Sequence, residues 1–255
     1  MPHAEAPGGE GRGVLCLHGL TGSPFELQPL ADACTGRGWN VELPMLPGHG
    51  GDVRALSDSS WRSWLAAAND GLDRLRTNSR HPVAVVGSSM GGLLALRLAV
   101  ARPADVGSLV VMGVPLRLPW FQRAGLRAFS LLPRIVRTHS ALALPKLRGV
   151  DVSDPEIRRR CPSSTHYSLP ALVSMLELME LTVRELHRVS VPTLIVHARA
   201  DRTVPFSQST ALARSLGSAV VERLTLTRSG HLVAVDVEAP LVIGDAVRFI
   251  RRHAG

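Results

Sequence analysis

The sequence has little lysine and few aromatic residues. Basic residues number 29, yet the only lysine is Lys146, and aromatic residues make up 4% of the chain. The formal net charge of +8 is therefore carried by arginines spread along the whole chain. A nucleic-acid-binding protein more often gathers its basic residues on one face, with aromatic side chains between them. This distribution argues against a nucleic-acid partner and leaves weak attraction to anionic membranes or substrates open.

Cysteine is also scarce, and its spacing shows no pattern. The three cysteines, Cys16, Cys34 and Cys161, form no CxxC pair and no metal-binding arrangement. We therefore expect reduced, structural thiols in a cytoplasmic protein, with no metal and no cofactor.

Long apolar runs are missing too. No stretch approaches the roughly 20 consecutive apolar residues of a membrane-spanning helix, so no membrane insertion is expected. The first residues lack the basic start and apolar run of a signal peptide. Residues 1–12 are instead predicted to be a flexible N-terminus.

Short apolar runs alternate with amphipathic stretches along most of the chain. Several runs are continuous in Val, Leu and Ile, which is typical of strands covered on both faces in a parallel sheet. The pattern predicts an α/β fold with a mostly parallel central sheet flanked by helices. Strands are expected at 14–18, 39–43, 83–86, 108–112, 193–197 and 220–226, and helices at 25–35, 61–77, 91–101, 207–216 and 241–252.

One region interrupts this alternation. Residues 115–189 show no convincing strand, and their helical segments, such as 169–187, are separated by prolines. We interpret this region as a helical cap, or lid, inserted into a core formed by residues 13–114 and 190–255. The alternative is an extra helical layer with no part in catalysis.

The sequence Gly87-Ser88-Ser89-Met90-Gly91 lies between a predicted strand and a predicted helix. A sharp strand-to-helix turn strains its central residue and leaves room only for glycine on either side. Ser89 would then stand exposed at the carboxyl end of the sheet as a nucleophile. An ordinary Gly/Ser-rich turn is the alternative, and Ser88 is expected to be structural.

A serine nucleophile needs a base, and the base needs an acid. His231 follows the last predicted strand and Asp201 follows the strand before it, so both belong to the sheet edge of Ser89. The chain order Ser, Asp, His is one of the orders in which such triads occur. Asp236 is a weaker candidate for the acid, and His197 is expected to be a buried, hydrogen-bonded side chain.

Two backbone N–H groups are candidate donors to an oxyanion. Met90 directly follows the nucleophile at a helix N-terminus, where the free N–H groups favour negative charge. Leu20 lies in His18-Gly19-Leu20-Thr21-Gly22, directly after the first strand. His18 itself is expected to brace this loop.

With these pieces together, the chain resembles the α/β-hydrolase superfamily, and within it the bacterial carboxylesterases and monoacylglycerol lipases. The resemblance extends to the segments 14–24, 44–50, 198–201, 229–231 and 233–250. It implies that Ser89, Asp201 and His231 are catalytic, that Leu20 and Met90 form the oxyanion hole, and that the insertion shapes the acyl pocket. The insertion matches poorly, and Leu144 stands near the polar position that holds the glycerol head in the lipases.

The preferred hypothesis is a serine carboxylesterase acting on short- to medium-chain acyl esters, with cap residues such as Phe121, Leu131 and Met175 lining an acyl groove. A monoacylglycerol lipase or lysophospholipase with a basic cap (Arg123, Arg127, Arg134 and Arg137) is one alternative, and a thioesterase is another. A non-catalytic ligand receptor on the same scaffold also stays open. The oligomeric state is left open.

Overall fold

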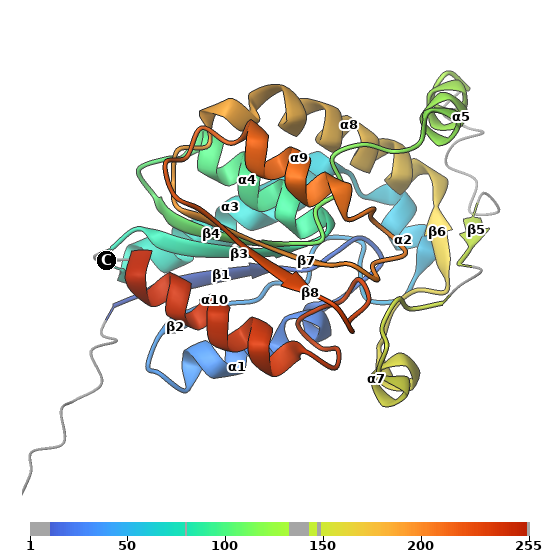
Figure 1. Cartoon of the computed structure of the whole chain (residues 1–255). Coiled ribbons are helices and arrows are strands. Elements are labelled where there is room, and N and C mark those ends of the chain that lie inside the picture. The colour runs from blue at the N-terminus through green and yellow to red at the C-terminus, as the bar shows by residue number, and fades with distance from the viewer. Residues whose placement is uncertain (1–10, 80, 133–142, 147–148, 254–255) are drawn as a thin grey trace, which may run out of the picture.

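The computed structural model describes residues 11–79, 81–132, 143–146 and 149–253. Its centre is a sheet of 6 strands in the order β2-β1-β3-β4-β7-β8, and every neighbouring pair is parallel. Helices cover both faces of this sheet (Figure 1). The predicted α/β class with a mostly parallel central sheet is therefore confirmed. The strands are β1 Gly13–Leu17, β2 Asn40–Glu42, β3 Val83–Ser88, β4 Val106–Met112, β7 Thr193–Ala198 and β8 Val221–Leu226.

The central strands are apolar because both of their faces are buried. Successive side chains on a strand point to opposite faces. Leu15 and Leu17 of β1 accordingly join one hydrophobic cluster, while Val14 and Cys16 join the other. These continuous apolar runs in the sequence are thus explained by two cores, one on each side of the sheet.

The helices divide between these two cores (Figure 1). Apolar residues of α1 and α10 pack on one face of the sheet, and those of α3, α4, α8 and α9 pack on the other. The helices of the core are α1 Gln28–Thr35, α2 Val53–Asp58, α3 Trp61–Asn78, α4 Met90–Ala101, α9 Ser207–Ser215 and α10 Ala239–His253.

The prediction of one continuous helix over 25–35 is wrong, because the chain after β1 forms two separate helical segments. A short 3-10 helix, η1 Pro24–Glu26, comes first, and α1 begins only at Gln28. Leu27 between them has a non-helical conformation (φ −121°, ψ 2°). Pro29 has no N–H to donate and is therefore tolerated only in the first turn, which fits a new helix start here.

The insertion also differs from its prediction, because it contains strands. β5 Ala143–Pro145 and β6 His166–Ser168 form an antiparallel pair. Three residues per strand are too few to show a clear alternation in the sequence. The helices of the insertion are α5 Trp120–Ser130, α7 Pro155–Arg160, α8 Leu169–Glu185 and the 3-10 helix η2 Leu186–Arg188.

The insertion divides into two parts by packing. Helix α8 contributes Leu178 and Met179 to the same cluster as β1 and β3, so it belongs to the helical layer of the core. Helices α5 and α7 instead lie at the periphery of the molecule (Figure 1). That residues 115–189 cover a site as a cap stays a prediction.

The described chain is held to the body from its first residues. Arg12 donates from its guanidinium to the Arg251 carbonyl (3.0 Å), and Ser79 donates to the Gly11 carbonyl (2.5 Å). The boundary between a flexible N-terminus (1–12) and the core stays a prediction, and residues 1–10 lie outside the described part. Within the described ranges, no helix combines the length and the apolar character needed to cross a bilayer.

Candidate active site

Ser89 occupies a sharp turn between β3 and α4. Its backbone has φ 52° and ψ −115°, a left-handed conformation that costs an ordinary L-residue about 1–3 kcal/mol. The turn is held from one side by Ser89 N, which donates to the Met112 carbonyl at the end of β4 (2.8 Å). A strained, well-anchored residue of this kind is typical of a functional position.

The flanking glycines make this turn possible. A Cβ added to Gly91 would lie 1.9 Å from the Leu17 carbonyl oxygen, and one added to Gly87 would lie 2.3 Å from the Gly91 carbonyl oxygen. Both obstacles are backbone atoms, which cannot move aside as a flexible side chain would. The predicted role of the two glycines therefore follows from the close approach of three backbone segments.

The position of Ser89 in the sheet is the one where ligands bind in open α/β folds. The chain leaves β1 toward β2 on one side and returns to β3 on the other side of β1. Ligands bind beyond the carboxyl ends of strands at such a reversal. The loops after β1 and β3, which carry Gly19 and Ser89, meet at this point.

The loop after β1 lies directly against Ser89. A Cβ added to Gly19 would lie 3.2 Å from the Ser89 Cβ. His18 braces the loop, because its Nε2 accepts from Leu46 N (3.1 Å) and its Nδ1 faces the Gly19 carbonyl (3.0 Å). Burial, with His49 nearby, lowers the pKa of His18 to about 3, so this imidazole is neutral. These contacts give His18 the structural task expected for it.

Asp201 and His231 are brought together at the same edge of the sheet. His231 Nδ1 lies 2.8 Å from Asp201 Oδ2, and the two side chains are 8% and 1% exposed. Gly113, which follows β4, lies behind them, since a Cβ there would be 2.9 Å from His231 Cε1. Met112, whose carbonyl anchors Ser89, directly precedes Gly113. The end of β4 therefore contacts both Ser89 and the Asp201–His231 pair.

Electrostatics fix the proton on the Nδ1 side of His231. Burial alone would lower the pKa of His231, but the Asp201 charge and hydrogen bond raise it, with help from Asp151 and Glu26. Burial would raise the pKa of Asp201. The surrounding charges and hydrogen bonds, above all those of His231, instead hold this pKa well below its usual range. Asp201 is thus a carboxylate that accepts from Nδ1 and leaves Nε2 as the basic atom.

A second histidine also contacts Asp201. His197 Nε2 lies 3.2 Å from Asp201 Oδ2 and 3.0 Å from the Val204 carbonyl, so this nitrogen carries the hydrogen. The other oxygen, Oδ1, accepts from Thr203 N (2.8 Å) and Val204 N (2.7 Å). The sequence predicts a buried, hydrogen-bonded His197 but does not predict that Asp201 is its partner. This contact forms because the loop after β7 folds back and places Asp201 beside the end of the strand.

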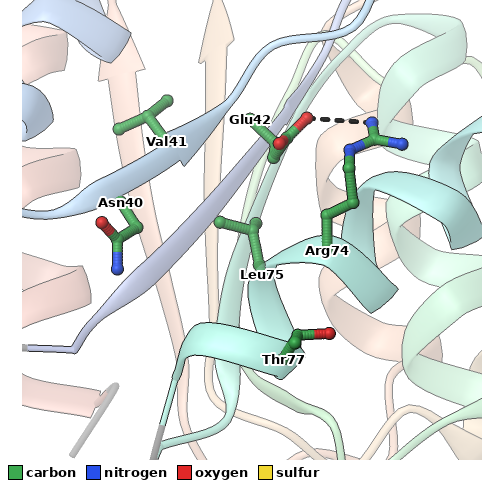
Figure 2. A pocket seen from close by; sticks show the side chains of 6 residues that line it. All are labelled: Asn40, Val41, Glu42, Arg74, Leu75 and Thr77. Atoms are coloured by element: carbon green, nitrogen blue, oxygen red, sulfur yellow. Dashed lines mark hydrogen bonds and ion pairs between the residues drawn. The ribbon is translucent and has the colours of Figure 1, made fainter.

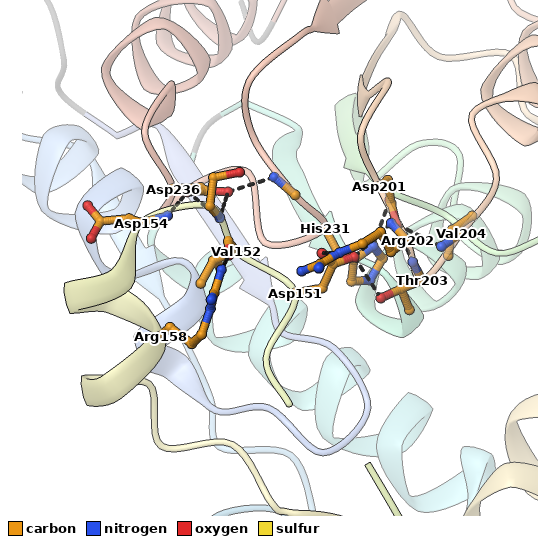
Figure 3. Close-up of polar contacts among 12 residues, drawn as sticks. Asp151, Val152, Asp154, Arg158, Asp201, Arg202, Thr203, Val204, His231 and Asp236 are labelled. Carbon is orange, nitrogen blue, oxygen red and sulfur yellow. Dashed lines mark hydrogen bonds and ion pairs between the residues drawn. The ribbon is translucent and has the colours of Figure 1, made fainter. Parts of the chain in front are cut away.

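The insertion holds the His231 loop in place (Figure 3). The Asp151 carbonyl accepts from His231 N (2.8 Å), and its carboxylate accepts from Arg202 N (2.8 Å) beside Asp201. Asp236 accepts from Gly230 N (2.6 Å) and from Ser153 N (2.8 Å). Asp236, the weaker acid candidate, therefore binds backbone N–H groups, and the imidazole faces Asp201.

The candidate oxyanion donors lie on both sides of Ser89. Met90 is the first residue of α4, so its N–H has no acceptor within the helix. In the opposite loop, Glu26 accepts from Gly19 N (2.9 Å), which leaves Leu20 as the next amide along the chain. Their role in binding an oxyanion stays a prediction.

The pattern that defines the family described as "Serine aminopeptidase, S33" matches residues 11–238. The chain belongs to the S33 family. The thermostable monoacylglycerol lipase of Bacillus sp. (strain H-257) is 29% identical over 243 residues, which cover 95% of this chain and 92% of that enzyme. The carboxylesterase of Bacillus subtilis (strain 168) is 22% identical over 244 residues, covering 96% and 94%.

Solved structures of lipolytic enzymes have the same fold. A structure from work on LipS and LipT, two metagenome-derived lipolytic enzymes, superposes with a TM-score of 0.86 at 26% identity and covers 96% of each chain. The Paleococcus ferrophilus monoacylglycerol lipase has a TM-score of 0.76 at 20% identity, covers 94% of each chain, and supports the fold alone. The predicted α/β-hydrolase resemblance is confirmed, as is an ester hydrolase at the level of the family.

A surface hollow lies away from Ser89 and the other residues of the candidate active site. It has a volume of about 410 Å³ and lies between β2 and the end of α3 (Figure 2). Asn40 on its wall pairs with Gly13, at the amino end of β1, whereas Ser89 stands beyond the carboxyl ends. A Glu42–Arg74 ion pair (2.9 Å) spans this hollow.

The residues expected to line an acyl groove are not all together. Met175 is buried in the main core, whereas Phe121 and Leu131 are exposed to solvent. Of the predicted basic face, Arg127 forms an ion pair with Glu180 (2.6 Å), and Arg134 and Arg137 lie outside the described residues. Within the described ranges, no group of three histidine, cysteine or carboxylate side chains is arranged to hold a metal ion.

Proposed function

We propose that this S33-family protein is a serine carboxylesterase that hydrolyses short- to medium-chain acyl esters through an acyl-enzyme on Ser89. The observation that carries the proposal is the His231–Asp201 hydrogen bond of 2.8 Å at the sheet edge where strained Ser89 stands. The curated monoacylglycerol lipase and carboxylesterase relatives support the same chemistry.

The first step makes the acyl-enzyme. His231 Nε2 takes the hydroxyl proton as Ser89 Oγ attacks the ester carbonyl, and Asp201 stabilises the imidazolium that forms. The carbonyl oxygen becomes an oxyanion, to which the N–H groups of Leu20 and Met90 donate. One such donor is worth about 3 kcal/mol of barrier. His231 then gives the proton to the leaving alcohol as the carbon–oxygen bond breaks.

The second step releases the acid. Water enters in place of the alcohol, His231 takes a proton from it, and its oxygen attacks the acyl carbonyl of the acyl-enzyme. The tetrahedral species collapses with return of the proton to Ser89 Oγ. No group other than the chain's own side chains and water is needed to balance these steps.

The test is hydrolysis of p-nitrophenyl esters of rising chain length, with a monoacylglycerol as a further substrate and Ser89→Ala beside the wild type. Removal of the nucleophile should lower kcat by about 10⁶-fold. The chain-length optimum then sizes the acyl pocket. If the wild type binds ligands tightly but turns over no ester, a ligand receptor explains the chain better.

A further inference from the structure

The chain's one lysine reaches the loop that flanks Ser89. Lys146 follows β5 in the insertion, and its Nζ donates to Thr21 Oγ1 and to Ser163 Oγ (2.8 Å). The same Nζ lies 5.1 Å from the ring centre of Tyr167, the chain's one tyrosine. The ammonium is thus partly buried, and neutral groups hold it on the loop after β1.

A carboxylate is buried within the same loop. Glu26 is 5% exposed, and its Oε2 accepts from Gly19 N (2.9 Å). The loop fits closely around it, because a Cβ on Gly22 would lie 1.9 Å from Glu26 Oε1. Glu26 therefore stabilises the loop whose next amide, Leu20, is a proposed oxyanion donor.

The charge of this carboxylate is unfavourable for the reaction. A Cβ on Gly19 would lie 3.3 Å from Glu26 Oε2 and 3.2 Å from the Ser89 Cβ, so the carboxylate is close to the reacting centre. Attack by Ser89 creates a second negative charge there. Like charges in a site of low dielectric constant repel strongly, which raises the barrier unless a cation offsets the first charge.

We infer that Lys146 is a positioning residue for this reaction: its ammonium offsets the buried charge of Glu26 and thereby keeps the Gly19–Gly22 loop favourable to the oxyanion. The inference rests on the proposed function, because it needs an oxyanion at Ser89. It also explains why a lysine of the insertion contacts the first loop of the core.

The titration of these groups gives the inference a pH signature. Burial lowers the pKa of Lys146 to about 8, while the charges of Glu26 and Cys161 act to raise it. Burial raises the pKa of Glu26, opposed by the Gly19 N–H, His231 and Lys146. Tyr167 faces the ammonium with a neutral ring. As pH rises through about 8, Lys146 loses its charge, and kcat should fall.

The experiment combines Lys146→Met, Glu26→Gln and the double variant in a kinetic cycle at pH 7 on p-nitrophenyl butyrate. Lys146→Met leaves the Glu26 charge uncompensated, so kcat should fall about ten-fold or more with little change in KM. Glu26→Gln in the Lys146→Met background should restore most of this loss, because the amide still accepts from Gly19 N without a charge. The matched control is Arg160→Met, which removes one exposed positive charge from α7 and should leave kcat unchanged.

The alkaline pH profile gives an independent measurement. Lys146→Arg should move the fall in kcat to higher pH, because a guanidinium stays charged there. Lys146→Met should lack that fall altogether. Should Lys146→Met not fold, the Lys146→Arg profile decides alone: a displaced fall supports the inference, and an unchanged one overturns it.

Two results of the kinetic cycle would also overturn the inference. One is a wild-type kcat in Lys146→Met, and the other is a folded double variant that stays as slow as Lys146→Met. Ser89→Ala, measured in the same assay, keeps the inference apart from the proposed function. An inactive Ser89→Ala beside a fully active Lys146→Met refutes the inference alone, whereas an active Ser89→Ala refutes the esterase mechanism and the inference with it.

Discussion

Replacing Asp201 by asparagine changes one atom of the site, and the surroundings dictate how the new amide is oriented. Oδ1 accepts from Thr203 N and Val204 N at 2.8 and 2.7 Å, so the amide oxygen must take this place. The NH₂ group then occupies the Oδ2 position, which faces His231 Nδ1 and His197 Nε2.

This orientation inverts the proton arrangement of the base. An NH₂ group donates to Nδ1, so the imidazole proton moves to Nε2, and His231 is no longer able to accept from Ser89. The loss expected for a triad with the wrong tautomer is about 10⁴-fold in kcat. The His197 N–H also meets a donor in place of an acceptor, which costs about 1–3 kcal/mol of unfolding free energy.

The assay is steady-state hydrolysis of p-nitrophenyl butyrate together with a thermal melt of each variant. Asp154→Asn is a suitable control, because Asp154 caps α7 from the surface and should leave kcat within about two-fold of wild type. A folded Asp201→Asn protein that keeps more than about a tenth of the wild-type kcat would show that Asp201 is not the acid.

Three further predictions concern pH, glycine and the His231 loop. Because Asp201 raises the pKa of His231, kcat/KM should fall with decreasing pH through a midpoint above the ordinary histidine value of about 6.5; a pH–rate profile with a lower midpoint would contradict this. Gly91→Ala should prevent stable folding, because the added Cβ would lie 1.9 Å from a backbone oxygen. The control is Gly125→Ala in α5, where the added Cβ meets nothing within 4 Å. Denaturant titrations should show that this control raises the unfolding free energy by about 1 kcal/mol. Asp236→Ala leaves the buried N–H of Gly230 and the part-buried N–H groups of Ser153 and Asp154 without their acceptor, so a loss of about 3 kcal/mol is expected in the same titrations, and a loss below about 1 kcal/mol would refute this account.

The features of the fold that the sequence predicts are those with local causes. The buried strands appear as continuous apolar runs because each lies between two cores, and the turn at Ser89 appears because close backbone contacts demand glycine at fixed spacing. Helix α2 and the β5–β6 pair were not predicted. They are short, and their stability comes from contacts with distant segments, such as the Ser57–Ser168 hydrogen bond of 2.8 Å.

The candidate site shows the same division. Ser89, Asp201 and His231 are predicted because each follows a strand and the chain order fits a known chemistry. Glu26 and Asp151 are not predicted, because their importance depends on what the fold places beside them. For Lys146, the sequence held a clue in its rarity, since every other basic residue of the chain apart from histidine is arginine.

The stretch Asp151–Asp154 has a consequence for engineering. It belongs to the insertion by sequence, yet its carbonyl and amide groups hydrogen-bond to His231 N and to the Asp236 carboxylate of the core. A chimaera that exchanges the whole of residues 115–189 for the insertion of another enzyme would therefore lose the anchor of His231, the proposed base. Grafts that retain these four residues and replace only the segments around them offer the safer route to new specificities.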